Sequence, residues 1–177
     1  MHYFQIDAEL LYWNFFLDFG PLNLGQLHRF STKLNALLAL DLDDEESSST
    51  TIVFYSSVDP NKRANAKYLI AAWQMLYLDR TPEEALRGFC LRSSSSETPK
   101  QQSHNSSSPP LMMGSSSSVI TTSTVPPFHD ASPGVCTYDL TVMDCLRGLA
   151  KARLYGFFDF NDFNVQEYEH FEQVEVS

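Results

Sequence analysis

Residues 53–66 have the order of a phosphate-binding site: a β-branched strand, a polar loop and the start of a helix. Cysteine phosphatases add to this order a low-pKa cysteine that attacks phosphorus, and an arginine six residues later that binds the phosphate oxygens. At that spacing Cys90, Cys136 and Cys145 are followed by Ser96, Val142 and Lys151. The sequence therefore predicts no catalytic residue of this kind, and we expect the chain as it stands to be inactive as a phosphatase.

Three other groups of residues have side chains that could take part in chemistry. Lys62 and Arg63 could bind phosphate at the helix start, but a solvated basic pair in a first helical turn is the favoured interpretation. Asp130 could be a general acid, yet there is no nucleophile for it to serve, so a turn-forming role before Ser-Pro-Gly is favoured.

The five histidines show no ligand spacing with cysteine or aspartate, and no Gly-rich nucleotide loop occurs. We therefore predict neither a metal site nor a cofactor.

The end of the sequence is acidic. Residues 155–177 contain six acids and no lysine or arginine, and Asn164 with Glu167 resembles a capping box that starts a helix. Glu169 and Glu172 are then at positions i and i+3, on one face. Such a pair can bind a basic side chain, contributing about 1.5 to 3 kcal/mol when partly buried and far less when exposed. A solvated acidic face is the alternative, and the residues alone leave both open.

The surrounding pattern predicts an α/β domain. Strands are indicated at 3–6 and 50–55, the second with the composition of a buried strand. One helix is expected after Asn23, with Leu27, Phe30, Leu34, Leu37 and Leu38 at helical spacing and one face on the sheet. Further helices are expected through Leu69, Ile70, Trp73 and Leu76, after the cap residue Thr81, and through Val142, Cys145, Leu146 and Leu149. The order of strand and helices favours the α/β class.

Residues 91–124 interrupt this pattern. Thirteen of these 34 positions are serine and three are charged, so the segment has little to bury against its ordering entropy. We expect a disordered insertion at 91–124 within a domain that covers 1–163. An acidic linker helix at 164–177 is expected to follow.

Composition limits the partners and the compartment. A net charge of −10 makes nucleic acid or an anionic membrane an unlikely target and favours a basic partner. Three cysteines without CxxC spacing favour reduced thiols in an intracellular protein. The longest uncharged apolar segment, residues 69–78, is about half of the roughly 20 residues that a membrane-spanning helix needs. No membrane or secreted location is therefore expected.

Several short sequence motifs, which follow one another in the same order, resemble those of a known family. They are Phe-His-Asp-Ala-Ser-Pro-Gly-Val-Cys-Thr-Tyr, Asp-Cys-Leu-Arg-Gly, Tyr-Gly-Phe-Phe-Asp-Phe and Glu-Tyr-Glu-His-Phe-Glu, all between residues 128 and 172. They closely resemble the N-terminal, non-catalytic domain of the mitotic-exit dual-specificity protein phosphatases, the cell-division-cycle-fourteen family. The resemblance implies a phosphatase-like sheet flanked by helices that has lost its catalytic cysteine. It places the Cys-x5-Arg loop in a C-terminal domain.

The resemblance also implies a function for the acidic helix. In the family, two glutamates of the motif that corresponds to Glu-Tyr-Glu-His-Phe-Glu line a groove between the two domains. This groove selects substrates with Lys or Arg after phospho-Ser-Pro. The two glutamates map to Glu169 and Glu172, while a further acid that the family's groove contains would either lie beyond Ser177 or be lost. The implied role is substrate recognition and scaffolding in an enzyme that dephosphorylates proline-directed sites in cell-cycle control.

The implied partners are phosphoproteins with basic residues after phospho-Ser-Pro and the C-terminal catalytic domain of the same protein. The implied locations are the nucleus, including the nucleolus, and the cytoplasm or spindle. A second hypothesis is a stand-alone, catalytically inactive pseudophosphatase that binds proteins. Its partner surface would be exposed aromatic side chains in residues 158–163.

Overall fold

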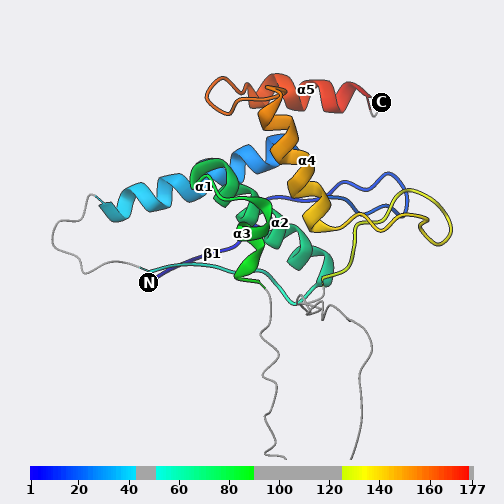
Figure 1. Ribbon diagram of the computed structural model, residues 1–177, viewed down its shortest axis with the longest axis horizontal. Coiled ribbons are helices and arrows are strands. Elements are labelled where there is room, and N and C mark those ends of the chain that lie inside the picture. The colour runs from blue at the N-terminus through cyan, green and yellow to red at the C-terminus, as the bar shows by residue number, and fades with distance from the viewer. Residues whose placement is uncertain (43–50, 90–124, 176–177) are drawn as a thin grey trace, which may run out of the picture.

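The computed structural model describes residues 1–42, 51–89 and 125–175 (Figure 1). Two short strands, β1 (His2–Phe4) and β2 (Ile52–Phe54), are parallel, with Tyr3 opposite Val53. The helices of these ranges are α1 (Leu24–Leu42), α2 (Pro60–Tyr77), α3 (Pro82–Arg87), α4 (Val142–Leu154) and α5 (Val165–Glu175). This mixture of helices and a small parallel sheet agrees with the predicted α/β class. The predicted insertion at 91–124 lies outside the described residues.

Helix α1 covers one face of the sheet, as the sequence predicts. Asn23 precedes it, and its side-chain Oδ1 accepts a hydrogen bond from the Gln26 backbone N–H at 2.9 Å. The Phe30 ring lies 6.2 Å from the Phe4 ring and 5.1 Å from the Phe54 ring, centroid to centroid. Leu38, at the end of the predicted apolar stripe, is instead exposed. The two strands are therefore held by aromatic packing on α1.

Strand β2 is less buried than its composition indicates. Ile52, Val53 and Phe54 are all half-buried, whereas the composition of the segment indicates a buried strand. In the described residues β2 pairs with β1 alone, so its other edge has no strand beside it. A high content of β-branched residues indicates that a segment fits a pleated sheet. It does not indicate how many neighbouring segments cover that strand.

Helix α2 is the centre of the core. It packs against α1, α3 and α4, and small residues on it are fully buried, including Ala64, Ala71 and Ala72. Across this contact lie Val142, Leu146 and Leu149 of α4, all buried as predicted, with Cys145 half-buried beside them. Figure 1 shows α4 crossing α2 and α3. Alanines let the helices approach closely, so leucines of α4 can fill the space between them.

Capping boxes start α3 and α4. The Thr81 hydroxyl accepts from the Glu84 backbone N–H at 3.3 Å, and the Glu84 carboxylate accepts from the Thr81 backbone N–H at 2.9 Å. Thr141 and Asp144 make the same exchange at 3.3 and 3.0 Å. The box at Thr81 confirms the helix start predicted there. Each box satisfies donors that a helix start otherwise leaves unpaired.

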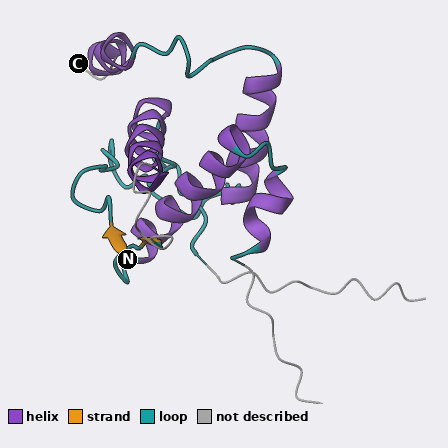
Figure 2. Cartoon of the chain, turned by 90° about the vertical axis from the view of Figure 1, so that its left-hand side faces the viewer, coloured by secondary structure: helices purple, strands orange, loops and turns teal. Residues whose placement is uncertain are grey.

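Helix α5 lies alongside α1, and both are seen end-on in Figure 2. The chain leaves α4 through Gly156, whose φ of 69° lies in the left-handed region that favours glycine. Among the described residues, no helix combines the length and the hydropathy that crossing a membrane would require.

Candidate functional site

The loop after β2 is closed by two carboxylates of the chain itself. Asp7 is buried, and its Oδ2 accepts a hydrogen bond from the Ser57 backbone N–H at 2.7 Å. Asp59 caps α2, and its Oδ1 accepts from the Lys62 backbone N–H at 2.9 Å. In a phosphate-binding loop, such amides and the helix N-terminus would bind the anion. Here these two amides are already satisfied by negatively charged oxygens.

The basic pair at this helix start is divided by the fold. Lys62 donates from Nζ to the Asp7 carbonyl oxygen at 3.2 Å, so its side chain folds back over the loop. Arg63 is exposed and makes no side-chain hydrogen bond or ion pair within the described ranges. The sequence predicts a solvated pair, which fits Arg63 better than Lys62.

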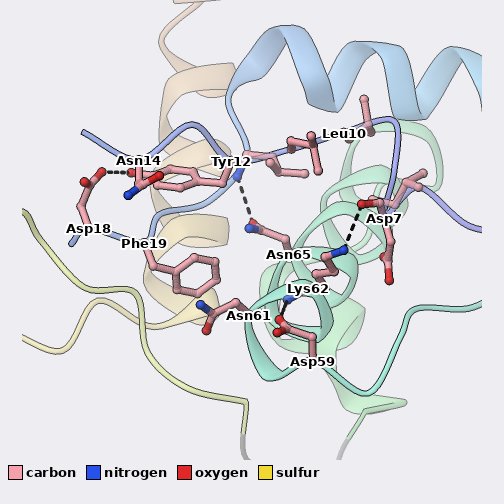
Figure 3. Close-up of a pocket in the computed structure, with 13 residues that line it drawn as sticks. Asp7, Leu10, Tyr12, Asn14, Asp18, Phe19, Asp59, Asn61, Lys62 and Asn65 are labelled. Atoms are coloured by element: carbon pink, nitrogen blue, oxygen red, sulfur yellow. Dashed lines mark hydrogen bonds between the residues drawn. The ribbon is translucent and has the colours of Figure 1, made fainter. Parts of the chain in front are cut away.

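A cavity of about 360 Å³ lies beside this loop (Figure 3). Among the described residues that line it are three acids, Asp7, Asp18 and Asp59, and one basic residue, Lys62. The Tyr12 hydroxyl donates to Asp18 Oδ2 at 2.5 Å, and burial together with this carboxylate raises the pKa of Tyr12 to about 12. Because acids outnumber bases here, this cavity disfavours an anionic ligand.

Asp130 forms a turn, as predicted. Its Oδ1 accepts hydrogen bonds from the Ser132 backbone N–H at 3.0 Å, from the Ser132 hydroxyl and from Cys136 Sγ at 3.4 Å. The ligand atoms of His129, Asp130 and Cys136 lie within 4.8 Å of one another, which their spacing in the sequence does not indicate. The Asp130 oxygen is already shared within the turn, so we interpret this group as structural.

Glu169 and Glu172 face helix α1. Glu169 forms a two-point ion pair with Arg29, which donates from Nε and Nη2 at 2.7 Å each. These hydrogen bonds hold the pKa of Glu169 below its usual value. Glu172 accepts from Asn23 Nδ2 at 2.6 Å and from the Tyr168 hydroxyl at 2.5 Å. The two glutamates therefore share a face, as the sequence predicts.

These partners are not visible in the sequence. Arg29 and Asn23 are 140 and 149 residues away from the glutamates that they contact, so no local pattern connects them. The predicted capping box is half formed: the Glu167 backbone N–H donates to Asn164 Oδ1 at 3.1 Å.

Glu169 and Glu172 differ in how their negative charges are compensated. Arg29 neutralises Glu169, whereas both partners of Glu172 are neutral groups.

The aromatic segment before α5 packs on α1. The His28 ring lies 5.1 Å from the Phe160 ring and 5.3 Å from the Phe163 ring, and the Phe158 ring contacts the Phe160 ring in a tilted arrangement. All three phenylalanines are half-buried, so they do not form the exposed surface that the second hypothesis assumes. Their tilted and edge-on ring contacts with one another and with His28 account for this burial. Phe157, just before them, is 79% exposed.

Comparison with known proteins gives a consistent result. The family model described as "Dual specificity protein phosphatase, N-terminal half" matches residues 1–108. "Dual specificity protein phosphatase CDC14A" of Mus musculus is 44% identical over 175 residues, which is 99% of this chain and 24% of the relative. "Dual specificity protein phosphatase CDC14B" of Mus musculus is 36% identical over 98% of the chain and 29% of the relative.

A more distant relative aligns in the same way. "Tyrosine-protein phosphatase CDC14" of Saccharomyces cerevisiae is 30% identical over 98% of the chain and 25% of the relative. The chain thus spans about a quarter of the length of these curated relatives. Almost every residue of the chain takes part in these alignments. The chain belongs to the CDC14 dual specificity phosphatase family and corresponds to its N-terminal region.

Proposed function

We propose that this chain is the substrate-recognition and scaffold region of a dual-specificity phosphatase that acts on proline-directed phosphosites in cell-cycle control. The observation that carries the proposal is the alignment of nearly the whole chain with a quarter of the CDC14 phosphatases. The chain contains no Cys-x5-Arg loop. The nucleophile, the phosphate-binding arginine and the general acid are then supplied by the catalytic domain, which forms and hydrolyses a phosphocysteine intermediate.

The acidic face of α5 is proposed to bind the basic residue after phospho-Ser-Pro. Glu172 supports this because its partners, Asn23 and Tyr168, leave its negative charge uncompensated. Glu169 supports it less directly, since Arg29 already pairs with it, although 34% of the Glu169 side chain is exposed. A substrate lysine or arginine would share this carboxylate with Arg29. Glu172 is therefore expected to contribute more than Glu169.

The remaining parts of the proposal follow the family. The partners are phosphoproteins with basic residues after phospho-Ser-Pro, together with the catalytic domain of the same protein. The locations are the nucleus, including the nucleolus, and the cytoplasm or spindle. Neither nucleic acid nor a membrane is proposed as a partner, because the chain carries a net charge of −10.

The test compares kcat/KM of the complete phosphatase for two phosphopeptides, one with lysine and one with alanine after phospho-Ser-Pro. We expect Glu172→Gln to reduce the preference for lysine by up to about fivefold, because Glu172 is exposed and an exposed ion pair contributes about 0.2 to 1 kcal/mol. Glu169→Gln should reduce it less. Glu167→Gln is the matched control, because Glu167 is exposed on the same helix and its side chain contacts neither Asn23 nor Arg29.

Two outcomes would count against this assignment. A preference for lysine that survives the double variant of Glu169 and Glu172 would show that the basic residue binds elsewhere. An equal loss in Glu167→Gln would show only a general effect of helix charge. Arg29→Ala adds a further check, because removing the competing cation should preserve or increase the preference.

A further inference from the structure

Both oxygens of the Glu172 carboxylate are held by neutral donors. Oε2 accepts from Asn23 Nδ2 at 2.6 Å, and Oε1 accepts from the Tyr168 hydroxyl at 2.5 Å. A glutamate on an exposed helix face otherwise samples several rotamers, and binding a ligand then costs the entropy of fixing one of them. With one donor on each oxygen, the plane of this carboxylate is fixed before any ligand arrives.

Asn23 uses both ends of its amide group. Its Oδ1 accepts from the Gln26 backbone N–H at 2.9 Å and so caps α1, while its Nδ2 donates to Glu172. Because the amide is planar, the bond at the cap restricts the directions in which Nδ2 can point. Serine and aspartate cap helices about as well as asparagine, but neither has an amide donor beside the capping oxygen. Asparagine at this position therefore caps α1 and holds the glutamate at once.

Tyr168 approaches the same carboxylate from α5. Its half-buried ring lies 5.3 Å from the Phe163 ring, centroid to centroid, and against the first turn of α1. A Cβ atom in place of the hydrogen of Gly25 would lie 3.0 Å from Cδ1 of the tyrosine ring. Glycine therefore allows this ring to lie close to α1 with its hydroxyl at Glu172. Burial and the hydrogen bond to Glu172 raise the pKa of Tyr168 above its usual value, so the hydroxyl keeps the proton that it donates.

Glu169, on the same face of α5, is held differently. Its partner Arg29 is a cation, which neutralises the carboxylate as it orients it. Asn23 and Tyr168 are neutral groups, so they orient Glu172 without removing its charge. A carboxylate that is fixed in direction and still negative is suited to a basic side chain, because its orientation does not have to change when the ligand binds.

We infer that Tyr168 and Asn23 are positioning residues, which contribute to the selectivity for a basic substrate residue by holding the Glu172 carboxylate in one orientation. The inference rests on the proposed function of Glu172 and adds to it two residues that act through this glutamate. Their contribution should be smaller than that of Glu172 itself. It should vanish when Glu172 is replaced.

The first experiment removes one donor at a time in the complete phosphatase. Its readout is the ratio of kcat/KM for the phosphopeptide with lysine after phospho-Ser-Pro to kcat/KM for the peptide with alanine. Tyr168→Phe keeps the aromatic ring and removes the hydroxyl, and Asn23→Ser keeps a capping oxygen and removes the amide donor. We expect each substitution to lower the ratio by about twofold, which is less than the limit of about fivefold expected for Glu172→Gln.

Each substitution has a matched control. Tyr155→Phe removes a hydroxyl from an exposed tyrosine that makes no side-chain hydrogen bond within the described residues. Asn164→Ser changes the residue before α5 whose Oδ1 accepts from the Glu167 backbone N–H. In the described part of the chain, the side chain of Asn164 makes no hydrogen bond to Glu172. Both controls should leave the ratio unchanged.

The second experiment combines Tyr168→Phe with Glu172→Gln. A residue that acts only through Glu172 has nothing left to position in the double variant, so the ratio should equal that of Glu172→Gln alone. The same non-additivity is expected when Asn23→Ser is combined with Glu172→Gln. A residue with a merely structural role would lower the ratio further, or would lower kcat/KM for both peptides alike.

Failure of this inference differs from failure of the proposed function. If Glu172→Gln lowers the ratio while Tyr168→Phe or Asn23→Ser leaves it unchanged, the proposed function stands and the positioning role of that residue is wrong. Additive losses in a double variant would also overturn the positioning role. If Glu172→Gln itself leaves the ratio unchanged, the proposed binding of the basic residue fails, and the positioning role fails with it.

Discussion

Asn65 shows how a single side chain holds two distant segments in register. Its Oδ1 accepts from the Leu22 backbone N–H at 3.0 Å, and its Nδ2 donates to the Gly20 carbonyl at 3.1 Å. The residue is buried in the middle of α2, 43 positions after Leu22. It therefore fixes where the chain enters α1, and with it the positions of Asn23 and Arg29, which contact Glu172 and Glu169.

Asn65→Ala should lower the free energy of unfolding by about 1 to 3 kcal/mol, because a buried donor and an acceptor lose their partner. Urea unfolding measures this difference. Asn61→Ala is the control, since Asn61 is exposed on the same helix, and its effect should stay within about 0.5 kcal/mol. Equal effects of the two substitutions would refute a special role for Asn65.

His28 makes stability depend on pH. Burial, and the positive charge of the neighbouring Arg29, lower the pKa of His28 below its usual value. The unfolded chain therefore binds a proton at His28 more readily than the folded chain. The stabilising contribution is complete above the unfolded pKa of about 6.5 and decreases as the pH falls below it.

The corresponding test measures urea unfolding at pH 7.5 and 5.5 in the natural chain and in His28→Gln. The loss of stability between these two pH values should be smaller in the variant, because the titrating group is gone. Carboxylates titrate in both proteins and cancel in the comparison. The same loss in both proteins would contradict the assignment to His28.

At the scale of elements, caps decide where the helices begin. The capping box of Thr141 and Asp144 starts α4, whose buried Leu146 and Leu149 pack against α2. A helix of 13 residues is marginal without tertiary contacts, so its start and its packing depend on each other. The cap also fixes the rotation of these leucines toward the core.

Thr141→Ala should reduce the free energy of unfolding by about 1 kcal/mol, the typical effect of losing a threonine cap. Thr32→Ala is the matched control, because Thr32 is exposed in the interior of α1, where alanine is the better helix former. That substitution should leave stability unchanged or slightly higher. If both variants lose the same free energy, the cap is not the cause.

In the folded chain as a whole, the parts before and after residues 90–124 pack into one core. Helix α4, after the Ser-rich segment, packs against α2 and α3, which precede it. Phe89 and Val125 line one cavity, so the two ends of the segment come together. The packed parts should therefore tolerate a much shorter connection.

Replacing residues 91–124 with a Gly-Ser linker of about eight residues, which spans at most roughly 26 Å, should leave a folded protein. Because a shorter loop costs less conformational entropy to close, we expect the free energy of unfolding to increase by about 1 kcal/mol. Thermal and urea unfolding measure it, with a scrambled 91–124 segment as the control that should change little. A chain that no longer folds would mean that the segment contributes contacts to the core.

Local patterns in the sequence are enough to predict the local structure. The stripe of Leu27, Phe30 and Leu34, the Thr81 capping box and the apolar face of α4 each lie within a few turns of helix. Helical periodicity and caps depend on residues three or four positions apart, so they can be recognised without a fold. The family motifs indicated the relationship to the phosphatases in the same way, because each motif is a continuous stretch of sequence.

Contacts between distant groups become visible only in the folded chain. The pairing of Glu169 with Arg29, the closure of the β2 loop by Asp7 and the place of Phe89 over Lys67 join segments far apart along the chain. The half-buried state of β2 and the packing of Phe160 on His28 were also settled there. Charge and aromatic content can be counted from the sequence, but the partner of each group depends on how the helices pack, which no local pattern records.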